Sequence, residues 1–307
     1  MRRWAKQTLG SAVFHGELLR AAVLVKNYVA SSFACMAYPD AFKDVKACCM
    51  FVGHMKSGGS MIGALLDAHP NAIIADEVDA PHLLSAGFSR DRLFHVLLHA
   101  SKRELQKGRV TARRLHAYSW LVPGQWQGRY SSLHVIGTSA TGTTTQQIGS
   151  SRALLGKIRD RLEGIALRLI HVIRNPYDPI ALSMIRGQRS FESASARYFQ
   201  TCELLQNLGR SLAHSEMLRV RYEDFVGSPA VTLAGVGRYL GLDAAPDYLS
   251  ACAGIIHPLP EQSRRLVEWQ PAWVDSVRER MQQYDFLAGY AFEHKDLEPQ
   301  PEGALVG

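Results

Sequence analysis

The sequence predicts an α/β fold in which a central parallel β-sheet is flanked by helices. Three observations predict it. Short apolar runs recur along the 307 residues with helical stretches between them, which is the pattern of strands joined by crossover helices. A glycine-rich turn follows the first apolar run, and an arginine ends the strongest one. Open α/β sheets bind their ligands at the carboxyl ends of such strands.

The individual elements follow from length and periodicity. Strands are expected at 47–52, 72–75, 133–136, 167–173 and 218–221. Helical periodicity is clearest in 60–68, 194–212, 229–240 and 271–284. The basic and aromatic segment 90–127 has no clean period. We expect it to cover the open face of the sheet, either as solvated helices and loops or as a substrate lid.

The chain is expected to contain one main domain with short extensions. Residues 1–45 form an N-terminal helical extension, residues 46–292 the domain, and the polar residues 293–307 a disordered tail. The apolar stretch 11–34 contains Glu17, Arg20 and Lys26. Because such charges are costly within a bilayer, a soluble helix is expected, with weak contact to a membrane surface as the alternative.

Charge and cysteine content restrict the partners. The formal net charge of +7 favours anionic ligands. No run of five basic residues and no zinc-finger spacing occurs, so nucleic acid is not expected as a partner. Five cysteines, an odd number without a CxxC pair, argue against a disulfide framework and a zinc site. The expected setting is therefore reduced and cytoplasmic, and no metal is expected.

The strongest candidate site is the turn after the first strand, Gly53-His54-Met55-Lys56-Ser57-Gly58-Gly59-Ser60. A glycine-rich turn that opens a helix exposes backbone N–H groups at a positive helix end, a geometry that binds phosphate or sulfate. Lys56 adds a mobile positive charge, and Ser57 and Ser60 add hydroxyl groups. The alternative is a tight strand-to-helix turn without a ligand.

A second candidate site follows the strand 167–173. Asp178 is expected to cap a helix whose first residue is Pro179. That arrangement holds Arg174 at the carboxyl edge of the sheet and puts Ser183 about one turn into the helix. The alternative is an arginine that only pairs with a surface carboxylate.

These motifs together resemble those of the PAPS-dependent sulfotransferase family, where PAPS is 3′-phosphoadenosine-5′-phosphosulfate. Lys56-Ser57-Gly58-Gly59-Ser60 resembles the family's 5′-phosphosulfate loop, and Arg174-Asn175-Pro176 with Asp178 its 3′-phosphate segment. Val220-Arg221-Tyr222-Glu223-Asp224-Phe225 and Ser263-Arg264 before Trp269 are similar to two later segments. The resemblance runs in order over residues 47–292 and implies a sulfotransferase domain with a fold like that of the P-loop nucleoside triphosphate hydrolases.

The resemblance also implies residue roles. Lys56, Ser57, Gly58, Gly59 and Ser60 hold the 5′-phosphosulfate, and Lys56 also stabilises charge on the leaving oxygen. Arg174 and Ser183 hold the 3′-phosphate, and Arg264 closes over the nucleotide. Tyr222 and Glu223 are expected to stabilise the fold rather than to act in catalysis.

Three departures from the family pattern affect these roles. Gly59 stands where the family has threonine, and Ser183 falls one position later than the family's serine. The strand end Gly137-Thr138-Ser139 offers no obvious base. Glu77 resembles a glutamate that some carbohydrate sulfotransferases use, and it is expected beside the loop as general base. Asp76 and His54 are the alternatives.

Two other functions stay open. A P-loop kinase has a similar sheet, but its loop reads GxxxxGK[ST], whereas Lys56 precedes the glycines here. A non-catalytic protein that binds nucleotide or sulfated glycan has the same scaffold. The acceptor class, whether carbohydrate, lipid or small molecule, is undecided. A mixed basic and aromatic group is a candidate to bind an anionic or sugar-bearing acceptor: Arg113, Arg114, His116, Trp120 and Trp126.

Overall fold

The computed structural model describes residues 2–111, 118–257 and 262–293, with side chains from residue 20 onward. The predicted disordered tail, apart from Glu293, lies outside these residues. Arg113, Arg114 and His116 of the candidate acceptor group also lie outside them.

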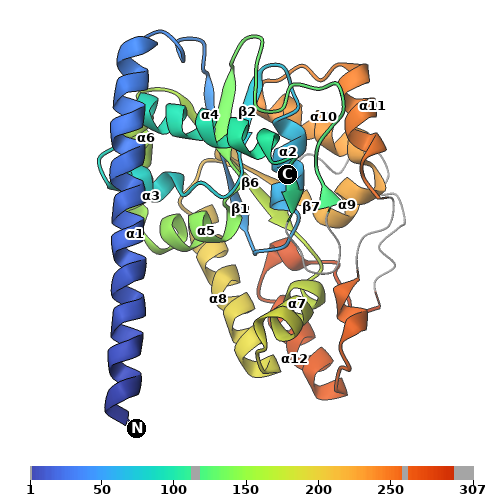
Figure 1. The fold of residues 1–307 in the computed structure, drawn as a ribbon. Coiled ribbons are helices and arrows are strands. Elements are labelled where there is room, and N and C mark those ends of the chain that lie inside the picture. Colours follow the sequence, from blue (N-terminus) through green and yellow to red (C-terminus); the bar gives the residue numbers. More distant parts are fainter. Residues whose placement is uncertain (1, 112–117, 258–261, 294–307) are drawn as a thin grey trace.

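A five-stranded, all-parallel sheet forms the centre of the molecule (Figure 1). Its strands are β1 (Ala47–Gly53), β2 (Ala72–Ala75), β5 (Val135–Thr138), β6 (Ala166–Ile173) and β7 (Met217–Arg221). Their order across the sheet is β2-β5-β1-β6-β7, and each neighbouring pair is parallel. The predicted fold class, a parallel sheet flanked by helices, is confirmed. Each of the five predicted strands overlaps an observed one.

Helices cover both faces of this sheet. They are α1 (Arg2–Ala37), α2 (Gly59–Leu66), α3 (Ala80–Ser85), α4 (Arg90–Gln106), α5 (Thr141–Ser150), α6 (Arg152–Leu162), α7 (Tyr177–Gly187), α8 (Phe191–Gly209), α9 (Tyr222–Gly227), α10 (Pro229–Leu240), α11 (Pro246–Gly254) and α12 (Pro271–Met281). Short 3-10 helices lie at η1 (His214–Glu216), η2 (Ser263–Leu266) and η3 (Asp285–Leu287), and β3 (Val110–Thr111) pairs with β4 (Tyr118–Ser119).

The core has two layers, one on each face of the sheet. Alternate residues of β1 supply them: Cys48, Met50 and Val52 face one layer, while Cys49 and Phe51 face the other. Because β1 is the central strand, every one of its residues is buried. Both thiols are packed in the core, and burial raises the pKa of Cys48 to about 12.

The structure also bears on the expectations for segment 90–127 and for the N-terminal helix. Part of segment 90–127 is α4, which packs against β2 and β5 and buries Leu93, Phe94 and Leu97 in the core. This part of the segment is thus a core helix, neither a lid nor a solvated helix. Helix α1 packs against α4, which runs across it in the view of Figure 1. Among the residues described, no helix is both long and apolar enough to cross a membrane.

Candidate functional site

The glycine-rich loop lies between β1 and α2, at the carboxyl edge of the sheet. Helix α2 begins at Gly59, and its N-cap residue Gly58, at φ 102°, provides no side-chain cap. The N–H groups of the first helical turn are therefore not satisfied by a capping side chain. They are oriented toward the loop, as an anion site requires.

Neighbouring side chains leave no room for a Cβ atom at Gly58 or at Gly59. A Cβ on Gly58 would lie 2.6 Å from the Tyr222 ring, and a Cβ on Gly59 would collide with the hydroxyl of Thr141. Thr141 thus explains the departure at Gly59. The Thr141 hydroxyl of α5 lies where a side chain at position 59 would stand. The loop is held between Tyr222 and the start of α5.

Three side chains of the loop have different environments. Lys56 is exposed and adopts a positive φ of 67°, an uncommon conformation for a residue other than glycine. Ser60 is half-buried. Ser57 is only 1% exposed, and its Oγ has no hydrogen-bond partner among the residues described. A buried hydroxyl without a hydrogen-bond partner destabilises the folded protein, unless a ligand forms a hydrogen bond to it.

Arg174, the residue after β6, joins this loop directly. Its side chain is buried, and its Nη1 donates a hydrogen bond of 3.1 Å to the main-chain carbonyl of Lys56. Its guanidinium carbon lies 4.7 Å from the centre of the Tyr222 ring, a cation–π distance. Its Nε lies 3.7 Å from the carboxylate of Asp178. Arg174 thus pairs with a carboxylate, as in the alternative, but this carboxylate is buried and not on the surface.

The predicted cap at Asp178 is also wrong. Helix α7 begins at Tyr177, and Asp178 is its second residue. The Tyr177 N–H donates instead to Oδ1 of Asn175, at 3.3 Å. Asp178 uses its buried carboxylate to accept the Arg264 N–H at 2.8 Å and the Arg264 Nη1 at 2.7 Å. Because Arg264 bonds both oxygens of this carboxylate, Asp178 is a fixed anchor between Arg174 and Arg264.

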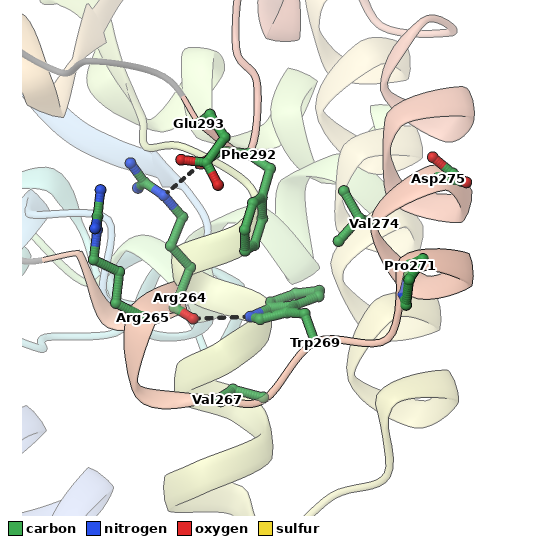
Figure 2. A pocket seen from close by; sticks show the side chains of 9 residues that line it. All are labelled: Arg264, Arg265, Val267, Trp269, Pro271, Val274, Asp275, Phe292 and Glu293. Atoms are coloured by element: carbon green, nitrogen blue, oxygen red, sulfur yellow. Dashed lines mark hydrogen bonds between the residues drawn. The ribbon is translucent and has the colours of Figure 1, made fainter.

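Arg264 was expected to close over the nucleotide, and the structure places it within the fold. Its side chain is 1% exposed, and its Nε donates to the carbonyl of Phe292 at 3.0 Å. Its own carbonyl accepts the indole N–H of Trp269, at 2.9 Å (Figure 2). A cavity of about 570 Å³ opens beside these residues, lined also by the exposed Arg265. Arg264 in this structure is a buried link rather than an open clamp.

Ser183 lies on a different side of α7 from Asp178, the residue that contacts Arg174. Because α7 begins two residues before Pro179, Ser183 lies almost two turns into the helix instead of one. At 100° per residue it lies about 140° around α7 from Asp178, the residue that contacts Arg174. Ser183 is half-buried. Its predicted contact with the 3′-phosphate stays a prediction.

Glu223 has a structural environment that agrees with its expected role. It is buried, accepts the Asn175 N–H at 2.8 Å and accepts the Tyr290 hydroxyl at 2.7 Å. It thus ties the end of β6 to the C-terminal segment. Tyr222, expected to be structural, forms a wall of the site as well, since it contacts both Gly58 and Arg174.

The three candidate bases differ in their surroundings. Glu77 follows β2, and β5 lies between β2 and β1, so Glu77 follows a strand that is not a direct neighbour of the strand that carries the loop. It is exposed, and partial burial together with the charges of Asp76 and Glu104 raises its pKa. Asp76 accepts the Ser139 hydroxyl at 2.7 Å.

His54 is the least suited of the three to act as a base. Its ring is stacked on Tyr198 with 3.8 Å between ring centres, and its Nε2 lies 2.9 Å from the Tyr198 carbonyl. Burial lowers its pKa to about 4. In the described part of the chain, no cluster of three or more His, Cys, Asp or Glu side chains is arranged to hold a metal ion.

A comparison with family models gives one match. The model of the sulfotransferase family matches residues 166–247, which run from β6 through α10 and include Arg174, Asp178 and Tyr222. This segment is sulfotransferase-like. The resemblance to the sulfotransferase family that the sequence predicts is confirmed. No curated protein matches the chain.

Solved sulfotransferase structures are similar to the chain at low identity. The sulfotransferase domain of the Synechococcus PCC 7002 olefin synthase is 18% identical, with 76% of this chain and 88% of that one covered at a TM-score of 0.44. A sulfotransferase from Alicyclobacillus acidocaldarius is 15% identical, covering 76% and 92% at 0.43. Mouse sulfotransferase SULT7A1, complexed with PAP, is 9% identical, covering 80% and 86% at 0.41. Similarity this distant decides neither fold nor reaction, so the fold assignment rests on the sheet itself.

Residues of α5 were missed by the sequence-based reasoning. Thr141 contacts the loop at Gly59, and Thr145 accepts the Gly53 N–H at 2.8 Å. The available signal was the run Thr141-Gly142-Thr143-Thr144-Thr145 directly after a strand. Hydroxyl-bearing residues at the carboxyl end of a parallel strand are candidates for such contacts.

Proposed function

We propose that this sulfotransferase-like chain uses 3′-phosphoadenosine-5′-phosphosulfate as donor and transfers its sulfuryl group to a hydroxyl or amine acceptor, with residues 46–292 as the catalytic unit. One observation carries the proposal. A buried arginine at the end of β6 is bonded to the backbone of a glycine-rich loop at the end of β1. Two anion-binding features thereby share one edge of the sheet.

The loop side of the site fits the phosphosulfate end of the donor. The uncapped first turn of α2 supplies N–H groups, and Lys56 supplies a positive charge. The unsatisfied hydroxyl of Ser57 is a donor already buried in the loop, and Thr141 adds a further hydroxyl beside Gly59. Ser60, at the second position of α2, completes the set.

The Arg174 side fits the 3′-phosphate. A guanidinium group forms charge-assisted hydrogen bonds to phosphate oxygens, and Arg174 is held in place by Lys56, Tyr222 and Asp178. We assign Ser183 to the same phosphate only by its likeness to the family's serine. Arg264 acts on this phosphate through Asp178 and Arg174, because it is buried against Asp178.

The reaction forms one bond between the acceptor oxygen or nitrogen and sulfur. It breaks the bond between sulfur and the oxygen that bridges it to the 5′-phosphate. Lys56 stabilises the negative charge that appears on this leaving oxygen, and adenosine 3′,5′-bisphosphate is the product. The acceptor's proton passes to the general base, for which we propose Glu77. The raised pKa of its carboxyl group makes it a stronger base than an ordinary glutamate.

A P-loop kinase is the second candidate, because Asp76 offers a carboxylate at a strand end. Two features favour the sulfotransferase. Lys56 precedes the glycines of the loop, and the cation at the end of β6 is suited to a third phosphate, whereas it would repel a nearby metal ion. A non-catalytic binding protein on this scaffold is the third candidate.

Binding and turnover separate these candidates. Thermal stability is measured in chelator with adenosine 3′,5′-bisphosphate, and in Mg²⁺ with ATP. The proposal expects the bisphosphate, at about 100 times its dissociation constant, to add about 2.7 kcal/mol of stability without metal. Stabilisation by Mg²⁺ and ATP alone supports the kinase. Binding of the bisphosphate without sulfuryl transfer to any acceptor supports the non-catalytic protein.

The acceptor class is to be found by assay. A panel of saccharides, lipids, phenols, alcohols and amines, each with labelled donor, measures transfer of the sulfuryl group directly. Trp120 and Trp126 lie in the described part of the candidate acceptor group, and both are half-buried. We also propose a cytoplasmic setting, because all five cysteines are free thiols and four of them are buried.

A further inference from the structure

The order of the strands places the parts of the proposed site in a row along the carboxyl edge of the sheet. Arg174 follows β6, the loop with Lys56 follows β1, and Glu77 follows β2. In the sheet order, β5 lies between the strand of the loop and the strand of Glu77. Because neighbouring strands are about 4.8 Å apart, these two strand ends are about 10 Å apart. An acceptor between Lys56 and Glu77 therefore lies over the carboxyl end of β5.

The chain that follows β5 carries no charge at this place. It reads Ser139-Ala140-Thr141-Gly142, and α5 begins at Thr141. The first three of these residues are buried, and the Thr141 hydroxyl donates to the Ser139 carbonyl at 3.0 Å. Gly142 is half-buried. It is thus the first residue after β5 that is accessible from the gap between Lys56 and Glu77.

Met55 lies against Gly142 and is itself open to solvent. A Cβ on Gly142 would lie 2.5 Å from the Cγ of Met55 and 3.4 Å from its Sδ. The methionine side chain therefore occupies the place that a side chain at position 142 would take. Even so, Met55 is 69% exposed. The preceding residue, His54, is buried with its ring stacked on Tyr198, so Met55 is the residue through which this part of the loop faces α5.

The position of Met55 suits a contact with an apolar group. Single exposed apolar residues are common on protein surfaces, but Met55 directly precedes Lys56 and extends over the start of α5. Methionine is unbranched and polarisable, and it packs against apolar and aromatic groups of varied shape. A saccharide would bring several hydroxyl groups to this place. The thioether of Met55 is only a weak hydrogen-bond acceptor, and Gly142 has no side chain.

We propose that Met55, lying on Gly142, contacts the acceptor and selects alcohols, phenols or amines whose reacting group is attached to an apolar or aromatic body. Met55 is then a specificity-determining residue, and a saccharide is a poor acceptor. This inference rests on the proposed function and adds the acceptor class to it. It concerns the acceptor alone, because the donor is assigned to the glycine-rich loop and Arg174.

The test is a series of linear primary alcohols from two to eight carbons, with glucose as the saccharide, each assayed with labelled donor. We expect kcat/KM to rise about two- to fourfold with each added methylene, since each one buries apolar surface, and glucose to be the poorest acceptor. Met55→Gln keeps nearly the same size but is polar. It should lower kcat/KM about tenfold for octanol and less than about twofold for ethanol. A purely structural role of Met55 would lower both equally.

A second variant and a matched control come from the same chain. In Gly142→Ala the new Cβ displaces Met55, so the ratio of kcat/KM for octanol and ethanol should fall here as well. Met36 at the end of α1 is 70% exposed, and Met36→Gln should leave this ratio unchanged. The Met55 and Met36 variants should keep the parent's melting temperature and its affinity for adenosine 3′,5′-bisphosphate, because both side chains are exposed.

Two results would overturn the acceptor class and leave the donor assignment intact. They are a preference of the parent for glucose over the alcohols, and an octanol-to-ethanol ratio that Met55→Gln leaves unchanged. If no alcohol reacts, calorimetric titration of hexanol into the complex with adenosine 3′,5′-bisphosphate decides. Binding that Met55→Gln weakens supports the contact, and no binding refutes it. Absence of bisphosphate binding in chelator refutes the proposed function and this inference with it.

Discussion

The Nη1 of Arg174 donates to the main-chain carbonyl of Lys56 at 3.1 Å. The residue proposed for the 3′-phosphate therefore holds the residue proposed for the leaving oxygen, through its backbone. The Tyr222 ring lies against both Arg174 and Gly58. The two ends of the proposed donor site are thus one connected structure, in which Arg174 contacts the backbone of Lys56 and not its side chain.

Replacing Lys56 by alanine should remove catalysis more than binding. The backbone carbonyl that Arg174 holds remains, so affinity for adenosine 3′,5′-bisphosphate should change little. The charge that stabilises the leaving oxygen is lost, which should lower turnover by about a hundredfold to a thousandfold. Saturation kinetics and calorimetry measure the two effects. Lys43→Ala, exposed before β1, is the control, and a Lys56 variant with parental turnover would refute the role.

Replacing Ser57 by alanine separates ligand binding from folding. The Ser57 hydroxyl is buried and has no partner in the described chain, so its removal should leave the melting temperature of the ligand-free protein unchanged or raised. The same change should reduce the stabilisation that adenosine 3′,5′-bisphosphate or the sulfated donor gives. Ser60→Ala, half-buried on the same loop, is the comparison. Loss of ligand-free stability in the Ser57 variant would mean that the hydroxyl is structural.

Much of the fold could be predicted because periodicity and strand composition are local properties. The strands 167–173 and 218–221 are observed within one residue of the predicted bounds, and helix 229–240 has the predicted bounds. Strand order is not local. The position of β5 between β1 and β2 depends on where the chain returns after segment 90–127, so the sequence did not show that the strand before Glu77 is not a direct neighbour of the loop's strand.

The location of the loop and of Arg174 at the carboxyl edge of the sheet could be predicted, since both follow strongly apolar strands. The site was missed where partners come from distant parts of the sequence. Asp178 was read as a helix cap, because a carboxylate before proline is locally suited to that role. Its actual partner, Arg264, is 86 residues away. Thr141 likewise reaches Gly59 only through the packing of α5 on β1.

Asp178→Asn tests the buried link between Arg174 and Arg264. The change leaves two buried guanidinium groups without their carboxylate, and breaking a buried ion pair in this way costs about 3–5 kcal/mol. Denaturant unfolding should show a loss of that order. Asp275→Asn is the control, because the pair of Asp275 with Arg278 is exposed and should contribute under about 1 kcal/mol. Equal effects of the two changes would contradict the assignment of Asp178.

Glu77→Gln tests the general base. The base works when it is deprotonated, so turnover should rise with pH through the pKa of Glu77, which lies above that of an ordinary glutamate. The variant should lose this acidic limb and about a hundredfold to ten-thousandfold in rate. Because the raised pKa means that folding disfavours the charged form, the variant should be no less stable than the parent at neutral pH. A retained limb would move the role to Asp76.

The central claim is that Arg174 binds the 3′-phosphate of the donor, and a thermodynamic cycle tests it most directly. Calorimetry in chelator measures the binding of adenosine 3′,5′-bisphosphate and of adenosine 5′-monophosphate to the parent and to Arg174→Ala. The account predicts that loss of the 3′-phosphate and loss of Arg174 are not additive, with a coupling energy of about 1.5–3 kcal/mol. Additive losses, or equal binding of both nucleotides by the parent, would contradict the account.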